Sequence, residues 1–168
     1  MHLISGRPEG RKLHEIKVMY RAQCLAAALG HGPEYDAENI DEPTLIISIS
    51  STDDQLPLIM NEAESENIRH IEYLQFDDID TDKSVHGLKP MSDEDAGHIV
   101  DALSQYVHEI SQIIVHCDAG YSRSPAVAAA LAKALGESDD EFFGYDYCMN
   151  NHVYTTLLKQ LSERKILK

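Results

Sequence analysis

The chain has 168 residues and carries 29 acidic against 14 basic side chains, which gives a formal net charge of −15. A charge of this sign and size opposes binding to nucleic acid or to an anionic membrane surface through bulk electrostatics. The hydrophobic content of 43% and charged content of 26% are ordinary for a globular protein, and the length fits one domain, over 1–168, with a sizeable core.

The N-terminal part is predicted to hold a short edge strand at 2–4, followed by turn residues. From about Arg11 to Leu29, apolar residues recur at helical spacing and stop before Gly30, which predicts one amphipathic helix. Cys24 lies on this apolar stripe and is interpreted as a core residue. Residues 31–43 are polar and acidic and show no clear pattern.

Two strands are expected in the next part of the chain. The β-branched run at 44–50 follows a proline and predicts a buried central strand. Residues 51–67 are expected to form a loop and a short helix. The partly alternating segment 67–76 predicts a second strand, which ends in an acidic loop at 77–82.

The C-terminal half alternates helices with one further strand. Ser92 and Asp95 form an imperfect capping box for a helix whose apolar stripe extends to Ile110. A strand is predicted at 112–116, followed by an alanine-rich helix that stops at a glycine after Leu135. Strands that alternate with helices in this way predict an α/β domain with a mostly parallel sheet covered by helices on both sides.

Two more helices are predicted after the alanine-rich one. Ser138 and Glu141 form a capping box for a short helix over 139–148, and a last amphipathic helix spans 153–161. Cys148 is interpreted as a packed thiol, with a redox role as the alternative.

The segment from Gln112 to Ala126 combines a strand, a tight loop and the start of the alanine-rich helix. Pro125 suits the first turn of that helix, because its missing N–H would have no partner there. If the backbone after Cys117 curls around a centre, its N–H groups form an anion site, reinforced by the positive end of the helix. Gly120 permits the positive φ or close backbone approach that such a curl needs.

The side chains of this loop suit attack on a tetrahedral anion. Arg123 offers a planar fork that can bind two phosphate oxygens at once. Cys117 lies at a helix N-terminus beside an arginine, a setting that favours a thiolate nucleophile. Ser124 is placed to donate a hydrogen bond to the sulfur and steady it as a leaving group, while the ring of His116 is expected to hold the loop through nearby backbone.

These residues resemble the active-site loop of the cysteine-dependent protein tyrosine phosphatases. The pattern is His116-Cys117, five residues, then Arg123-Ser124, and the stretch from Gly120 to Pro125 is most similar to the dual-specificity branch and its small bacterial relatives. The resemblance is densest over 112–135 and implies a dual-specificity phosphatase-like fold and a cysteinyl-phosphate intermediate, with no metal or other cofactor. It also implies a substrate-binding loop made of Asp118, Ala119, Gly120, Tyr121, Ser122 and Arg123.

The same resemblance implies a general acid on a loop that follows a strand. Asp78 lies 39 residues before Cys117 in such a position and is the first choice, with Asp77 second and Asp80 third. A solvated acidic face is the alternative interpretation of this run. Asn150 matches a family position at which an asparagine, usually after a proline, begins a helix near the active loop, although Met149 replaces the proline here.

The expected substrates are phosphorylated proteins or peptides, first on tyrosine and then on serine or threonine. Asp118, in a loop without lysine, disfavours highly phosphorylated inositol lipids, and the acidic composition disfavours RNA 5′-triphosphates. A non-catalytic phosphopeptide-binding module and a rhodanese-type sulfurtransferase are the alternatives. Three cysteines do not make a disulfide framework, and without a signal-peptide pattern a cytoplasmic location is expected.

Overall fold

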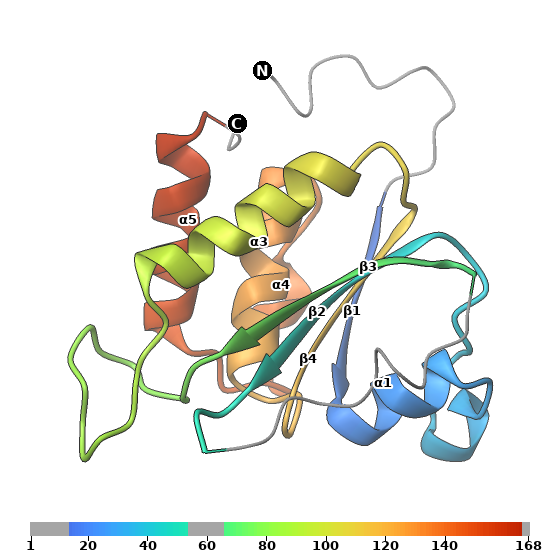
Figure 1. Ribbon diagram of the computed structural model, residues 1–168, viewed down its shortest axis with the longest axis horizontal. Helices are drawn as coiled ribbons and strands as arrows, with labels where there is room; N and C mark the ends of the chain where they lie inside the picture. The colour runs from blue at the N-terminus through green and yellow to red at the C-terminus, as the bar shows by residue number, and fades with distance from the viewer. Residues whose placement is uncertain (1–13, 54–65, 166–168) are drawn as a thin grey trace.

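A four-stranded sheet forms the centre of the computed structural model, which describes residues 14–53 and 66–165 (Figure 1). The strands follow the order β1-β4-β2-β3, and each neighbouring pair is parallel. Their bounds are β1 (Glu15–Tyr20), β2 (Thr44–Ser50), β3 (Ile68–Gln75) and β4 (Gln112–Cys117). The strands predicted at 44–50, 67–76 and 112–116 are therefore confirmed, and the sheet is parallel throughout the described residues.

Helices cover both faces of this sheet, as predicted. Three of them pack with one core on one face, and α1 packs with a second, smaller core on the other (Figure 1). The helices are α1 (Arg21–Ala28), α3 (Asp93–Tyr106), α4 (Arg123–Ala134) and α5 (Asn151–Glu163), with short 3-10 helices at Gly32–Tyr35 and Asp140–Phe143. None of the described helices has the length and apolar character needed to cross a membrane.

The two cores follow from the alternation of side chains along the strands. Every residue of β2 and β4 is buried, because both strands are internal and covered on both faces. Ile47 and Val115 point to the core shared with α3, α4 and α5, whereas Ile46 and Ile114 point to the core shared with α1. The alanine-rich helix α4 is buried along almost its whole length, since its small side chains allow it to approach the sheet closely.

The single helix predicted from about Arg11 to Leu29 is wrong in its first half. Residues 15–20 instead form strand β1, which pairs with β4, and only the second half is helical, as α1. Ile16 and Val18 pack against the larger core, a use of alternate positions that helical spacing concealed. Cys24 is fully buried, which confirms its core interpretation. The strand expected at 2–4 lies outside the described residues, as does most of the loop and helix expected at 51–67.

The helix predicted over 139–148 is also wrong. The chain forms only the 3-10 helix at 140–143, and the Ser138 hydroxyl accepts a bond from the Asp140 N–H instead of capping a longer helix. Beyond it the backbone becomes extended at Gly144 and then bonds to the loop that follows β4. Cys148 is exposed in this segment, so its interpretation as a packed thiol is corrected. The Ser92–Asp95 capping box at the start of α3, by contrast, is confirmed.

Candidate active site

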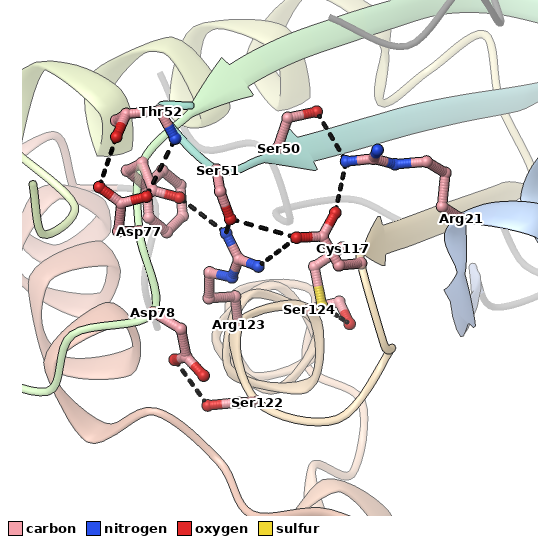
Figure 2. A network of polar contacts seen from close by, with 12 residues as sticks. Arg21, Ser50, Ser51, Thr52, Asp77, Asp78, Cys117, Ser122, Arg123 and Ser124 are labelled. Atoms are coloured by element: carbon pink, nitrogen blue, oxygen red, sulfur yellow. Dashed lines mark hydrogen bonds and ion pairs between the residues drawn. The ribbon is translucent and has the colours of Figure 1, made fainter. Parts of the chain in front are cut away.

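The site lies at the carboxyl edge of the sheet, where ligands of open α/β sheets bind. Cys117 is the last residue of β4, and Arg21 directly follows β1. Ser51 directly follows β2, and Phe76 directly follows β3. All four strands therefore deliver groups to one region, although these residues are far apart in the sequence (Figure 2).

Gly120 sets the shape of the loop between β4 and α4. Its φ is +65°, in the region that favours glycine. A Cβ added there would lie 2.9 Å from the carbonyl carbon and oxygen of Met19 and from the backbone nitrogen of Tyr20. Both reasons proposed for a glycine, the positive φ and the close backbone approach, are thus present at one position.

The backbone of this loop is held by its carbonyl groups. The Tyr121 carbonyl accepts from the Cys148 N–H at 3.0 Å, and the Ser122 carbonyl accepts from the Asn150 N–H at 3.1 Å. Within the described part of the chain, the backbone N–H groups of residues 119–122 donate to no acceptor. These donors precede the N-terminus of α4, so the loop has the unpaired N–H groups that an anion site requires. The side chain of Tyr121 is 52% exposed, and this residue contributes its backbone to the loop.

Cys117 lies in a protected position at the start of the loop. It is 2% exposed, and its Sγ lies 3.1 Å from the Oγ of Ser124 in the first turn of α4. The fully buried ring of His116 places Nδ1 3.4 Å from the Cys117 carbonyl oxygen. Burial lowers the pKa of His116 to about 4, so the ring is neutral near pH 7 and adds no charge beneath the loop.

Arg123 is 5% exposed, and its guanidinium is fixed by three groups (Figure 2). Nη1 donates to the Phe76 carbonyl at 2.7 Å and to the Ser51 hydroxyl at 3.1 Å. Nη2 donates to Asp118 Oδ2 at 3.1 Å. A guanidinium has five N–H groups, so the Nε–H and the second Nη2–H remain without an acceptor among the described residues. These two lie along one edge, which matches the bidentate geometry of phosphate recognition.

The three candidate acids have different surroundings, and Asp77 is enclosed by the fold. Its buried carboxylate accepts from the Thr52 N–H at 2.9 Å, the Thr52 hydroxyl at 2.7 Å and the Lys89 N–H at 2.7 Å. Burial opposes ionisation, but these hydrogen bonds and the nearby charge of Arg123 outweigh it and hold the pKa of Asp77 below its ordinary value. Asp77 is therefore an ionised structural group.

Asp78 faces the loop, whereas Asp80 does not contact it. Asp78 is exposed, and its Oδ1 accepts from the Ser122 hydroxyl at 2.8 Å (Figure 2). The same oxygen accepts from Asn150 Nδ2 at 2.8 Å. Its Oδ2 has no hydrogen-bond partner among the described residues, which leaves one carboxyl oxygen to carry a proton. Asp80 accepts from the His152 N–H at 2.6 Å, at the start of α5.

Asn150 joins α5 to the acidic loop. Its Oδ1 accepts from the Val153 N–H at 3.0 Å and so caps α5, which confirms the prediction that an asparagine begins this helix. Its Nδ2 donates both to Asp78 and to the Ile79 carbonyl, the latter at 3.2 Å. The position of Asp78 is therefore set by α5 as well as by the loop.

Several groups of this site were not identified in the sequence. Arg21 falls in the middle of the helix predicted from about Arg11 to Leu29, so the sequence did not indicate that it follows a strand. Ser51 follows a strand that the sequence predicts correctly. Because ligands of open α/β sheets bind at the carboxyl ends of strands, this position could have indicated that Ser51 lies at the site. The role of the Phe76 carbonyl has no sequence signal, because any residue carries that group. In the described part of the chain, no three His, Cys, Asp or Glu side chains are grouped so as to hold a metal ion.

Comparison with solved structures identifies the fold. The chain is similar to human DUSP28, with a TM-score of 0.53 and 15% identity, over 89% of this chain and 93% of that one. It is similar to the PTP-2 phosphatase of Cydia pomonella, with a TM-score of 0.54 and 14% identity, over 89% and 87% of the two chains. It is also similar to the human tyrosine phosphatase-like serine/threonine/tyrosine-interacting protein, with a TM-score of 0.50 and 16% identity, over 89% of this chain and 90% of that one.

No family model and no curated protein sequence matches the chain. At these identities the similarity to solved structures is one of fold. The chain has the fold of the dual-specificity cysteine phosphatases, as the loop motif predicted.

Proposed function

We propose that this protein is a phosphatase of the dual-specificity type, which hydrolyses phosphate monoesters through a cysteinyl-phosphate intermediate. The observation that carries the proposal is the buried guanidinium of Arg123, whose Nε–Nη2 edge is left for an anion beside the unpaired N–H groups of residues 119–122. Cys117 begins this loop and contacts Ser124, and Asp78 contacts the loop through Ser122, so the proposed nucleophile and acid come from different segments of the chain.

In the first step, the Cys117 thiolate attacks phosphorus and the bond from phosphorus to the leaving oxygen breaks. Arg123 and the loop N–H groups stabilise the charge on the three equatorial oxygens. Asp78 gives its proton to the departing oxygen, which leaves as an alcohol or phenol. Ser122 and Asn150 hold the side chain of Asp78 beside the loop, which supports the choice of Asp78 as the acid.

In the second step, water attacks the cysteinyl phosphate, and Asp78 takes a proton from that water. The sulfur–phosphorus bond breaks, inorganic phosphate leaves, and Cys117 returns to the thiolate. Ser124 stabilises the departing sulfur by a hydrogen bond, given the 3.1 Å distance between Oγ and Sγ. Water supplies the oxygen and the proton in this step, and the proton regenerates Asp78 as the acid for the next turnover.

The proposed substrates are phosphorylated proteins or peptides, with phosphotyrosine first and phosphoserine or phosphothreonine next. Cys117 is recessed, so the phosphorylated side chain has to project into the loop. The acidic chain disfavours substrates with several phosphates, because each further negative charge adds repulsion.

Cys117→Ser is expected to abolish turnover of para-nitrophenyl phosphate and of a phosphotyrosine peptide while binding of tungstate persists. The change removes the nucleophile and leaves the guanidinium and the N–H groups in place. Phosphate release and isothermal titration calorimetry measure the two properties. Wild-type rates in the variant would overturn the mechanism. Tungstate binding without any phosphate release by the wild-type protein would instead favour the non-catalytic phosphopeptide-binding module.

A further inference from the structure

Asp118 places a carboxylate inside the proposed phosphate-binding loop, between Arg21 and Arg123. Its Oδ1 accepts from Arg21 Nη2, and its Oδ2 accepts from Arg123 Nη2 and from the Ser51 hydroxyl, each of the latter at 3.1 Å. Arg21 Nη2 also lies 3.4 Å from the Ser50 hydroxyl, at the end of β2. The carboxylate is therefore shared, with one oxygen for each arginine.

This sharing matters because a carboxylate competes with phosphate for the same donors. A carboxylate with two free oxygens forms its strongest pair with a guanidinium by accepting two parallel N–H bonds. In the structure, Asp118 reaches Arg123 through Oδ2 alone and uses only one N–H of Nη2. The edge formed by Nε and the second Nη2–H stays open as long as Oδ1 is engaged elsewhere.

We propose that Arg21 is a positioning residue for this site: it holds Asp118 Oδ1 and thereby keeps the carboxylate from covering the phosphate-binding edge of Arg123. Asp118 then orients the Arg123 guanidinium through one bond and leaves the two donors that the anion needs. The proposal rests on the proposed function in one respect, namely that the phosphate binds at Arg123. Arg21 acts through Asp118 and needs no contact with the substrate.

A purely structural role makes a different prediction. Arg21 is the first residue of α1, and its ion pair with Asp118 also fastens β1 and α1 to the loop. If fastening through this ion pair were its whole contribution, Asp118→Asn alone would weaken anion binding as much as Arg21→Gln, because either change breaks the pair. If Arg21 acted only as a distant positive charge, Arg21→Gln would weaken anion binding equally with or without the Asp118 carboxylate. A double-mutant cycle separates these cases, because only a positioning role predicts that Asp118→Asn restores binding to the Arg21→Gln protein.

The experiment measures binding of inorganic phosphate and of tungstate by calorimetry to the full chain. The variants are Arg21→Gln, Asp118→Asn and the double variant. Arg21→Gln is expected to weaken binding about tenfold, the size of a lost charged hydrogen bond. In the Asp118→Asn background the same change is expected to weaken binding by less than about twofold. Lys17→Gln is the matched control, since it removes an equal charge from β1 at a residue that pairs with Glu15 and Glu38.

Equal losses in both backgrounds, or no loss on changing Arg21, would overturn the positioning role. A loss from Asp118→Asn alone as large as the loss from Arg21→Gln would also overturn it, because that result is expected of fastening. Thermal unfolding of each variant identifies a loss that comes from misfolding. Because anion binding needs no turnover, the two proposals fail separately. A protein that binds phosphate but never hydrolyses an ester would refute the proposed phosphatase activity, and its binding data would still test the positioning role of Arg21. An active phosphatase with an additive cycle would refute the role of Arg21 alone. A wild-type chain that binds neither anion would refute both.

Discussion

Gly120 and Gly87 both have a positive φ, but only Gly120 is closely surrounded by backbone. Comparing them separates the need for a positive φ from the need for space in the loop between β4 and α4. Gly120 and Gly87 have φ values of +65° and +80°. A Cβ at Gly87 would meet nothing within 4 Å, whereas at Gly120 it would meet the backbone of Met19 and Tyr20 at 2.9 Å. Strand backbone cannot yield as a flexible side chain can, so the two positions share the strain of a positive φ but not the steric clash.

Gly120→Ala is therefore expected to abolish anion binding and turnover, and to destabilise the fold by about 1–3 kcal/mol more than Gly87→Ala, as overpacking does. Urea unfolding gives the free energies, and calorimetry with tungstate gives the binding. If the two variants lost equal stability and both kept full activity, the close approach at Gly120 would not matter to the site.

Asp78 and Asp80 differ by two positions but only Asp78 contacts the loop, through Ser122. Asp78→Asn is expected to lower kcat on a phosphotyrosine peptide by about 10²–10⁴-fold, the usual contribution of a general acid. The loss on para-nitrophenyl phosphate should be smaller, because that leaving group needs less protonation. Steady-state kinetics on both substrates measure the difference. Asp80→Asn is the control and should keep most of the activity. A uniform loss across leaving groups for Asp78→Asn would show that Asp78 is not the acid.

At the level of elements, Asp77 joins segments from both sides of the site. Its carboxylate accepts from Thr52, just after β2, and from Lys89, between the acidic loop and α3. Its own N–H donates to the Lys89 carbonyl at 2.6 Å, which closes the base of that loop. The loop that carries Asp78 is thus fixed at its root by the neighbouring acid.

The hydrogen bonds to the Asp77 carboxylate make the free energy of unfolding depend on pH. The folded pKa of Asp77 lies below the unfolded value of about 3.9, so its contribution is complete above that value and is lost as pH falls through the lower, folded pKa. Asp77→Asn is expected to cost about 1–3 kcal/mol at pH 7 and to show a shallower decline below about pH 4. Urea unfolding between pH 3 and 7 measures both effects. The exposed Asp82→Asn serves as the control. Wild-type and Asp77→Asn curves that stay parallel down to pH 3 would contradict this account.

Elements with a strong local pattern were predictable from the sequence. Strand β2 combines β-branched residues with a preceding proline, and α3 combines a capping box with a regular apolar stripe. Strand β1 was missed because its partner, β4, is almost a hundred residues away and its own apolar spacing also suits a helix. The helix predicted over 139–148 does not form as such, because the Cys148 N–H bonds to the Tyr121 carbonyl and the Asn150 N–H that follows bonds to the Ser122 carbonyl, outside any helical pattern.

The same division applies to the site. Cys117, Gly120, Arg123 and Ser124 lie within eight positions of one another, so the sequence alone predicts the loop from their residue types and spacing. Arg21 and Ser51 reach the loop from 97 and 72 residues away in the sequence, to Asp118 and Arg123 respectively. No spacing rule connects such residues before the order of the strands is known.

For the molecule as a whole, positive charge at the site contrasts with an acidic chain. The net charge of −15 repels anions at long range, so the proposed capture of phosphate would depend on Arg123 and the loop N–H groups at short range. Arg21 offsets the one carboxylate that the loop itself contains. We therefore infer that affinity for an anion is decided within the loop and its immediate neighbours.

The convergence of four strand ends on one region has a consequence for folding. Arg21, Ser51, Phe76 and Cys117 each follow or end a different strand, so the proposed anion-binding arrangement exists only when the whole sheet has assembled. A bound oxyanion then stabilises the complete native state and no partly folded form. Saturating phosphate would shift the entire cooperative unfolding transition to higher temperature without splitting it, and an intermediate with any one strand detached would gain nothing from the ligand.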